Sequence, residues 1–273
     1  MPSYEESYID LLNQTLEFGS KRPSRVGTTV STFGAMISIY DLHDNKFPIL
    51  TQRRVFYKGV LGELAAFLRG ATELSEFKQF GCNYWDDNAA KWSYNEGADI
   101  SDYSVGAIYG AKWRHFHGVD QLRRLVTSIQ ADPYGRRHLL TTYDPSETWQ
   151  CLPPCHLLAQ FYCTDDKKLS CMVYMRSVDL CLGLPSDVIL YSVLLMLVCN
   201  ETNYEPGTLS FTLGDCHIYE NHIDLWKEQR EKPQLELPTW NLNPAATLKS
   251  FVPSDFELVN YQHGEKFEYP LAT

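Results

Sequence analysis

Residues 152–199 read LPPCHLLAQFYCTDDKKLSCMVYMRSVDLCLGLPSDVILYSVLLMLVC, and this stretch decides the class of fold. Two apolar runs at 157–163 and 169–174 flank the turn signal Asp165-Asp166, which predicts two neighbouring strands. The apolar run 188–199 then predicts a buried helix that begins near Asp187. Strands followed by a long buried helix indicate an α+β protein.

The flanking sequence adds further elements to this centre. Ser3 and Glu6 form a capping-box pattern before an apolar periodicity that ends at Gly19, so the chain opens with an amphipathic helix. We expect further helices at 60–68, 122–129 and 221–231, and further strands at 36–40, 138–143, 208–212 and 256–261. The basic segment 21–27 is expected to be flexible, with Arg25 on a loop, and 70–121 to be an aromatic-rich loop region. No repeat or linker divides the chain, so residues 1–273 are predicted to form a single domain.

Charge and cysteine content exclude several classes of protein. The net charge of -10 argues against a stable nucleic-acid partner, which needs clustered Lys and Arg. The eight cysteines occur in a large chain that opens without an apolar signal segment, so we expect a cytoplasmic protein with reduced thiols. This expectation includes a viral protein that acts in the cytoplasm of its host. The apolar run 188–199 is shorter than the roughly 20 residues that cross a bilayer, so no membrane partner is expected.

Cys155 is the candidate nucleophile. It follows the rigid turn Leu152-Pro153-Pro154, and arginines elsewhere in the chain could favour its thiolate. The alternative is a buried structural cysteine, which is the commoner fate of a free thiol. No Cys-x-x-Cys pair exists and Leu158 stands where a zinc deaminase needs its second cysteine, so no metal is expected.

Two groups of arginines are candidate phosphate ligands. Arg136 and Arg137 follow a helix-ending Asp-Pro pair, and Arg176 with Ser177 ends a predicted strand. Paired guanidinium groups and a hydroxyl suit a phosphate dianion. A lone arginine would more often form a surface ion pair of little value, so the hypothesis depends on their combination.

Four motifs in a fixed order resemble the thymidylate synthase family over nearly the whole chain. They are Pro154-Cys155-His156, Arg176-Ser177-Val178-Asp179, Leu182-Gly183-Leu184-Pro185 and Gly214-Asp215-Cys216-His217-Ile218-Tyr219. The resemblance implies a mixed β-sheet packed with helices, one face of which forms a homodimer interface. It also implies one-carbon transfer from 5,10-methylenetetrahydrofolate to C5 of a pyrimidine deoxynucleotide after Cys155 adds to C6.

The same resemblance implies a role for each further site residue. The catalytic residues would be Cys155, Glu63, Tyr109, Asp187 and His156, with Glu63 organising proton transfers and Tyr109 removing the C5 proton. Arg25, Arg176 and Ser177 would bind the phosphate together with Arg136 and Arg137 of a second subunit, and His217 and Tyr219 would bind the ribose. Trp85, Asp179, Leu182 and Gly183 would bind the folate, and residues 270–273 would close over it.

Three departures from the family pattern concern the base and the product. Asp187 replaces an asparagine that reads uracil, and an acceptor-only carboxylate suits the N4 amino group of cytosine. Met175 and Ser186 replace a glutamine and a phenylalanine, so the chain resembles viral deoxycytidylate hydroxymethylases, which admit water in the last step. We therefore expect dCMP conversion to 5-hydroxymethyl-dCMP. The alternatives are a dCMP C5-methyltransferase, a thymidylate synthase or hydroxymethylase acting on dUMP, and a non-catalytic nucleotide- or RNA-binding homologue.

Overall fold

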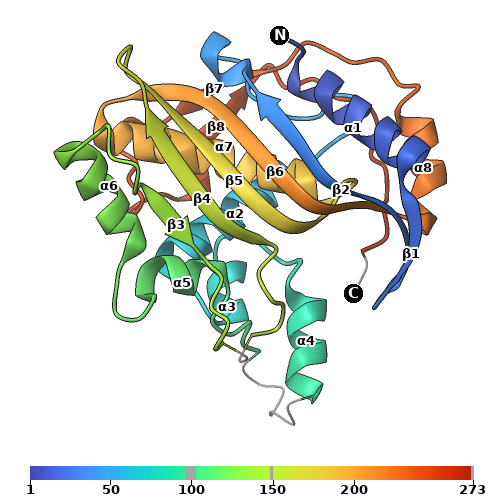
Figure 1. The fold of residues 1–273 in the computed structure, drawn as a ribbon, viewed down its shortest axis with the longest axis horizontal. Helices are drawn as coiled ribbons and strands as arrows, with labels where there is room; N and C mark the ends of the chain where they lie inside the picture. The colour runs from blue at the N-terminus through green and yellow to red at the C-terminus, as the bar shows by residue number, and fades with distance from the viewer. Residues whose placement is uncertain (96–102, 148–149, 272–273) are drawn as a thin grey trace.

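A computed structural model describes residues 1–95, 103–147 and 150–271, and its centre is a six-stranded sheet in the order β1-β2-β6-β5-β4-β3 (Figure 1). The strands are β1 (Ser20–Ser24), β2 (Gly27–Ile39), β3 (Leu139–Thr141), β4 (His156–Cys163), β5 (Lys168–Asp179) and β6 (Glu205–Tyr219). β5 and β6 run parallel and the other pairs are antiparallel, so the sheet is mixed. The prediction of an α+β fold is confirmed.

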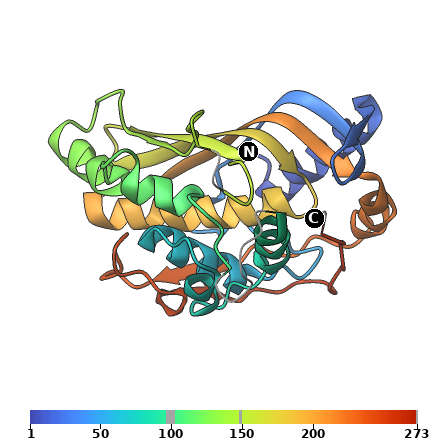
Figure 2. The ribbon, with the colours of Figure 1, turned by 90° about the horizontal axis from the view of Figure 1, so that it is seen from below.

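The helix α7 (Gly183–Thr202) lies against the sheet, with α2 (Tyr57–Arg69) packed on it. Figure 2 shows both helices on one side of the sheet and no described helix over the other. The remaining helices are α1 (Tyr4–Phe18), α3 (Leu74–Lys78), α4 (Asp86–Asn95), α5 (Tyr109–His115), α6 (Gln121–Ala131) and α8 (Ile223–Gln229). Short 3-10 turns η1 (Asp41–Asp44), η2 (Glu220–His222) and η3 (Pro253–Asp255), and the hairpin of β7 (Thr239–Leu242) and β8 (Phe256–Val259), complete the described chain.

The predicted helices and strands are present, but several boundaries were wrong. The segment that we expected to be flexible contains β1, and Arg25 lies in the tight turn between β1 and β2. The expected loop region contains the short helices α3, α4 and α5. Their mixed composition shows no helical apolar pattern, so the sequence did not predict them. The strands β5 and β6 extend beyond their apolar cores to Asp179 and Tyr219, and the polar residues at these ends interrupted the apolar pattern used for the prediction.

The helix α7 is the buried core helix that the sequence predicted, and it begins four residues earlier than expected. The helix has 20 residues because it extends beyond the apolar run 188–199 at both ends, so the length of the run alone did not exclude a membrane span. The helix is long and apolar enough to be a membrane span by composition alone, but most of it is buried inside the protein. The helix carries apolar side chains on all of its faces, because it packs between the sheet and α2.

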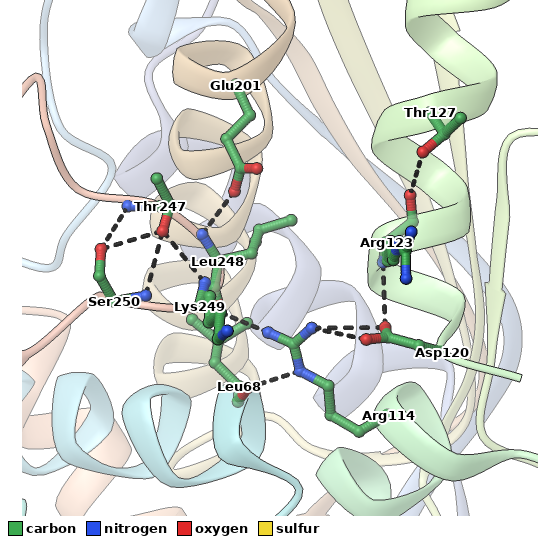
Figure 3. Close-up of polar contacts among 10 residues, drawn as sticks. All are labelled: Leu68, Arg114, Asp120, Arg123, Thr127, Glu201, Thr247, Leu248, Lys249 and Ser250. Atoms are coloured by element: carbon green, nitrogen blue, oxygen red, sulfur yellow. Dashed lines mark hydrogen bonds and ion pairs between the residues drawn. The ribbon is translucent and has the colours of Figure 1, made fainter.

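Arg114 ties three parts of the helical layer together (Figure 3). Its Nε donates to the Leu68 carbonyl at the end of α2 at 2.7 Å, and its Nη2 donates to the Leu248 carbonyl. Its Nη1 lies 3.1 Å from Asp120, which caps the start of α6. A guanidinium fork can make all three contacts at once, and no other side chain has this geometry.

We expect Arg114→Ala to lower the free energy of unfolding by about 2–4 kcal/mol, because two buried carbonyls and a carboxylate lose their donor. Arg123→Ala is the matched control, since Arg123 is an exposed arginine on the neighbouring α6, and its effect should stay within about 0.5 kcal/mol. Urea unfolding of the two variants measures the difference. Equal stability of the two variants would contradict the structural role of Arg114.

Candidate active site

Two adjoining cavities open along the carboxyl-terminal ends of β5 and β6. The larger has a volume of about 850 Å³ and the smaller of about 550 Å³. Their shared walls are Glu63, Asp179, Gly183, Asp187 and Tyr219. One cavity can therefore hold a nucleotide while a second ligand lies against its base.

Cys155 lies in the wall of the larger cavity, immediately before β4. Its backbone N–H donates to the Tyr109 hydroxyl at 2.8 Å, and its carbonyl accepts the Arg176 backbone N–H at 2.8 Å. The Arg176 side chain donates to the carbonyls of Pro153 and Pro154 at 2.8 and 2.7 Å. These bonds hold the Pro-Pro turn rigidly, so the thiol has a fixed position beside the ligand space.

Arginine alone does not make Cys155 a thiolate in this structure. The Arg176 Nη2 lies 3.8 Å from Sγ and lowers the thiol pKa, but burial raises it more and the net pKa lies above the ordinary value. The predicted thiolate is thus corrected to a thiol at neutral pH in the free protein. Its activation requires that its proton leave during the reaction.

Glu63, on α2, is a buried carboxyl group held by two donors. The Tyr84 hydroxyl donates to Oε2 at 2.8 Å and the Trp85 indole N–H to Oε1 at 2.7 Å. Burial raises the pKa of Glu63 to about 7, although both hydrogen bonds lower it. A carboxyl with this pKa can both take and give a proton near neutral pH. Tyr84 was missed in the sequence, and Trp85 lines the larger cavity, away from the slot predicted for the folate.

We expect Glu63→Gln to become more stable relative to the unmutated protein as pH rises. The folded state holds the Glu63 proton up to a pKa of about 7, whereas the unfolded chain releases it near the ordinary value of 4.5. The wild type therefore loses about 3 kcal/mol between pH 4 and pH 8 that the glutamine variant keeps. Urea unfolding of both proteins at the two pH values tests this. A difference that does not change with pH would show that Glu63 is solvated.

Asp187 lies on the first turns of α7 and forms part of the wall of both cavities. Burial raises its pKa well above the ordinary value, and the neighbouring Glu63 carboxyl raises it further. The His156 Nε2 lies 3.9 Å away, and burial lowers the pKa of His156 to about 3, so this ring is neutral. The Tyr191 hydroxyl pairs with His156 Nδ1 at 2.7 Å, a contact that the sequence did not indicate. Burial therefore favours the neutral form of Asp187 at the cavity wall, in contrast to the expected acceptor-only carboxylate.

The ribose and phosphate candidates come together at the other end of the larger cavity. Arg25, Arg176, Ser177, His217 and Tyr219 all line it. In addition, Asp215 accepts from His217 Nδ1 at 3.0 Å and from the Arg22 guanidinium at 2.7 Å. These contacts fix the ring of His217. Asp215 and His217 are two residues apart in β6, so their side chains lie on the same face of the strand. This spacing was the signal that could have identified Asp215.

Arg136 and Arg137 do not reach this cavity within one chain. They are exposed and lie between α6 and β3. The sequence placed them at the phosphate of a second subunit, and that placement stays a prediction.

The smaller cavity fits a folate. Asp179, Leu182 and Gly183 line one side, and Phe267, Tyr269 and Leu271 line the other. A flat heterocycle with ring N–H groups would find a carboxylate acceptor in Asp179 and apolar contacts around it. The predicted closing residues Ala272 and Thr273 lie outside the described residues.

Asp179, Cys181 and His222 also lie together, with their potential ligand atoms within 4.8 Å of one another. However, Asp179 Oδ1 accepts the Cys181 backbone N–H at 2.8 Å, and burial raises the pKa of the Cys181 thiol well above its usual value. A protonated thiol is a poor metal ligand. We therefore assign no metal to these three residues.

Fold and cavities define a candidate enzyme with a cysteine in the wall of its larger cavity, and comparison with known proteins identifies its family. The family model described as Thymidylate synthase matches residues 6–273. The chain is 40% identical to Thymidylate synthase 1/2 of Encephalitozoon cuniculi (strain GB-M1), covering 94% of this chain and 93% of that protein. It is 34% identical to Thymidylate synthase of Mycoplasma pneumoniae, covering 94% and 96%. The chain belongs to the thymidylate synthase family.

A third relative joins this domain to another enzyme. The chain is 36% identical to the Bifunctional dihydrofolate reductase-thymidylate synthase of Leishmania major, covering 94% of this chain but 53% of that protein. Membership of the family establishes folate-dependent one-carbon transfer to C5 of a pyrimidine nucleotide, with 5,10-methylenetetrahydrofolate as the donor. The relatives are named as thymidylate synthases, so they give no support to the resemblance to deoxycytidylate hydroxymethylases.

Proposed function

We propose that this enzyme transfers a one-carbon unit to C5 of dCMP and releases 5-hydroxymethyl-dCMP. The observation that carries the proposal is Asp187, which faces the shared wall of the two cavities where the base of a nucleotide would lie. An asparagine at this position would match the donor and acceptor pattern of uracil.

Because the pKa of Asp187 is raised, the proposed preference for cytosine over uracil needs a different reason from the acceptor-only carboxylate. A carboxylic acid donates through O–H and accepts through C=O, so it can pair with N3 and the N4 amino group of cytosine. It can also pair with O4 and N3–H of uracil. Cytosine N3 is a ring base and shares the proton with the carboxyl group, whereas uracil O4 is a far weaker base. The shared proton makes the stronger, charge-assisted bond with cytosine.

The residues of the larger cavity account for the covalent steps. The Cys155 thiol loses its proton to water in the cavity as its sulfur forms a bond to C6, and the C5–C6 π electrons then form the new carbon–carbon bond at C5. The folate supplies a methylene carbon at the oxidation level of formaldehyde. The C5 proton would pass by way of the Tyr109 hydroxyl, whose position the Cys155 backbone N–H fixes, to water in the cavity. The bond between the methylene carbon and its folate nitrogen would break at the same time, so that tetrahydrofolate leaves and water can add to the methylene carbon on C5. Expulsion of the Cys155 thiolate from C6 restores the aromatic ring.

Ser186 supports hydroxymethylation over methylation. Its small side chain lines the smaller cavity, and its hydroxyl donates to the Leu182 carbonyl at 3.0 Å. A serine leaves more room beside Asp187 than a phenylalanine would, and a water molecule in that space could add to the new carbon at C5. A dCMP C5-methyltransferase remains the alternative if hydride from the folate reaches that carbon first.

The second candidate is dUMP as substrate, because the named relatives are thymidylate synthases and a protonated Asp187 can pair with uracil. A non-catalytic nucleotide- or RNA-binding homologue is disfavoured, because Cys155, Arg176 and His217 all line one cavity.

Initial rates with each nucleotide at saturating folate test the base preference. We expect kcat/KM for dCMP to exceed that for dUMP by at least about tenfold, equivalent to ~1.4 kcal/mol. A preference for dUMP would overturn the proposal in favour of thymidylate synthase activity.

We also propose that the enzyme works as a homodimer through the helix-free face of the sheet. Phe33, Met36 and Tyr162 on this face are 82%, 69% and 64% exposed. Met172 and Tyr174 of β5 are exposed there too. An apolar sheet face of this kind is typical of a subunit interface. A second copy on it would bring its own arginines near the phosphate end of the cavity.

We expect inactive Arg136→Ala and inactive Cys155→Ser subunits to restore activity when mixed. A mixed dimer contains one site with both an intact Cys155 and an intact Arg136 and one site with neither. Random pairing makes about half of all dimers mixed, so the mixture should regain about a quarter of the wild-type activity. Activity assays after subunit exchange measure it, with each variant alone as the control. No recovery in confirmed mixed dimers would show that Arg136 acts within its own chain or not at all.

A further inference from the structure

His222 is a fully buried histidine that touches both walls of the smaller cavity. Its Nε2 donates to the Pro270 carbonyl at 2.7 Å, because a carbonyl can only accept. Its ring packs edge-on against Tyr219 and Tyr269, with centroids 5.4 and 5.2 Å away. Residues 266–269 and Leu271 form the C-terminal wall of the cavity, so His222 anchors that wall.

The other ring nitrogen of His222 faces the carboxylate on the opposite wall. Nδ1 lies 3.8 Å from Asp179 Oδ1, which is too long for a hydrogen bond, and it has no other partner among the described residues. Burial lowers the pKa of His222, but Asp179 and the Pro270 carbonyl together raise it, and the net pKa is above the ordinary value. The other charged or titratable groups around the ring are Arg53, which lowers its pKa, together with Cys181, Tyr219 and Tyr269. A buried donor without a partner, directed at a carboxylate, can gain its bond by a small movement.

Asp179 is prepared to accept that bond. Its Oδ1 already accepts the Cys181 backbone N–H, so this oxygen is committed to the protein. Asp179 lines both cavities, and its second oxygen accepts no hydrogen bond from the described residues. A bond from His222 to Oδ1 would fix the plane of the carboxylate and therefore the direction of the free oxygen.

We propose that His222 is a positioning residue that couples the C-terminal wall of the folate cavity to Asp179, holding Pro270 with one ring nitrogen and orienting the Asp179 carboxylate with the other. This inference rests on the assignment of the smaller cavity to folate, but not on the choice of base. A proton, not a metal ion, joins the two side chains, because the adjacent thiol of Cys181 stays protonated.

The test measures folate binding without turnover. All variants are made in a Cys155→Ser background, and 5,10-methylenetetrahydrofolate is titrated calorimetrically into enzyme saturated with dCMP or with dUMP. We expect His222→Phe, which keeps the ring packing, to raise the folate Kd at least about tenfold and to leave the nucleotide Kd within about twofold. In the presence of Asp179→Asn the same change should raise the folate Kd by less than about threefold.

A matched control separates coupling from simple anchoring. Tyr269→Phe removes the bond from the Tyr269 hydroxyl to Gln229, which also anchors the C-terminal wall but does not touch Asp179. We expect its effect on the folate Kd to be the same with Asp179 and with Asn at that position. If His222→Phe does not fold, His222→Gln replaces it in the same cycle. Equal effects of the His222 variant in both Asp179 backgrounds, or a Zn²⁺ ion found at Asp179, Cys181 and His222, would overturn the proposal.

Discussion

Replacing Cys155 by serine is expected to reduce turnover by at least about 10⁴-fold, equivalent to ~5.5 kcal/mol, because the bond to C6 cannot form. A serine hydroxyl needs a strong general base, and the adjacent His156 is a weak one, because burial lowers its pKa to about 3 and its Nδ1 is already paired with Tyr191. The nucleotide should still bind, because Arg25, Ser177 and His217 are unchanged. Tritium release from C5 and equilibrium binding measure the two properties separately.

Cys151 provides the matched control for this prediction. It lies four residues away, and burial raises the pKa of its thiol to about 12. No cation counteracts this effect of burial on Cys151, whereas Arg176 does so at Cys155. Cys151→Ser should therefore keep turnover within about threefold of the wild type. Substantial turnover by Cys155→Ser would exclude a covalent mechanism through this residue.

Asp187→Asn is expected to move the substrate preference from dCMP towards dUMP. The amide keeps one donor and one acceptor in fixed places, which match O4 and N3–H of uracil, and it has no proton to share with cytosine N3. The ratio of kcat/KM values should change by at least about tenfold, or ~1.4 kcal/mol. Rates with both nucleotides and both proteins at saturating folate give this ratio.

Asp179→Asn is the control for the base preference. Asp179 also lines both cavities as a carboxylate, but we place it at the folate, so its replacement should raise the folate KM and leave the nucleotide ratio unchanged. An unchanged ratio for Asp187→Asn would remove the physical basis for choosing cytosine.

The core of the fold could be predicted because its signals are local. The apolar run of α7, the capping box at Ser3 and the Asp165-Asp166 turn each determine the conformation of their own segment. In contrast, α3 and α5 are stabilised by packing against α2, and β1 by pairing with β2. Tertiary contacts of this kind leave no periodic pattern in a short segment.

Motif order predicted residues that the structure brings to the wall of one cavity, whereas it did not predict their protonation states. The thiol of Cys155 and the carboxyl groups of Glu63 and Asp187 all have raised pKa values, and burial is the first cause each time. Burial depends on the whole fold, so the sequence predicted a thiolate and an acceptor-only carboxylate. The same reason explains why His222 was missed, since its two contacts join Asp179 and Pro270, which are far apart in the chain.

One incubation tests the central claim most directly. Purified enzyme is given equal concentrations of dCMP and dUMP with 5,10-methylenetetrahydrofolate, and the nucleotide products are identified by mass spectrometry at early time. The account predicts that dCMP gains the mass of one CH₂O unit in a reaction that Cys155→Ser does not perform, while dUMP stays largely unchanged. A CH₂ gain on dUMP, with dCMP unchanged, would contradict the account and identify the protein as a thymidylate synthase in activity as well as in family.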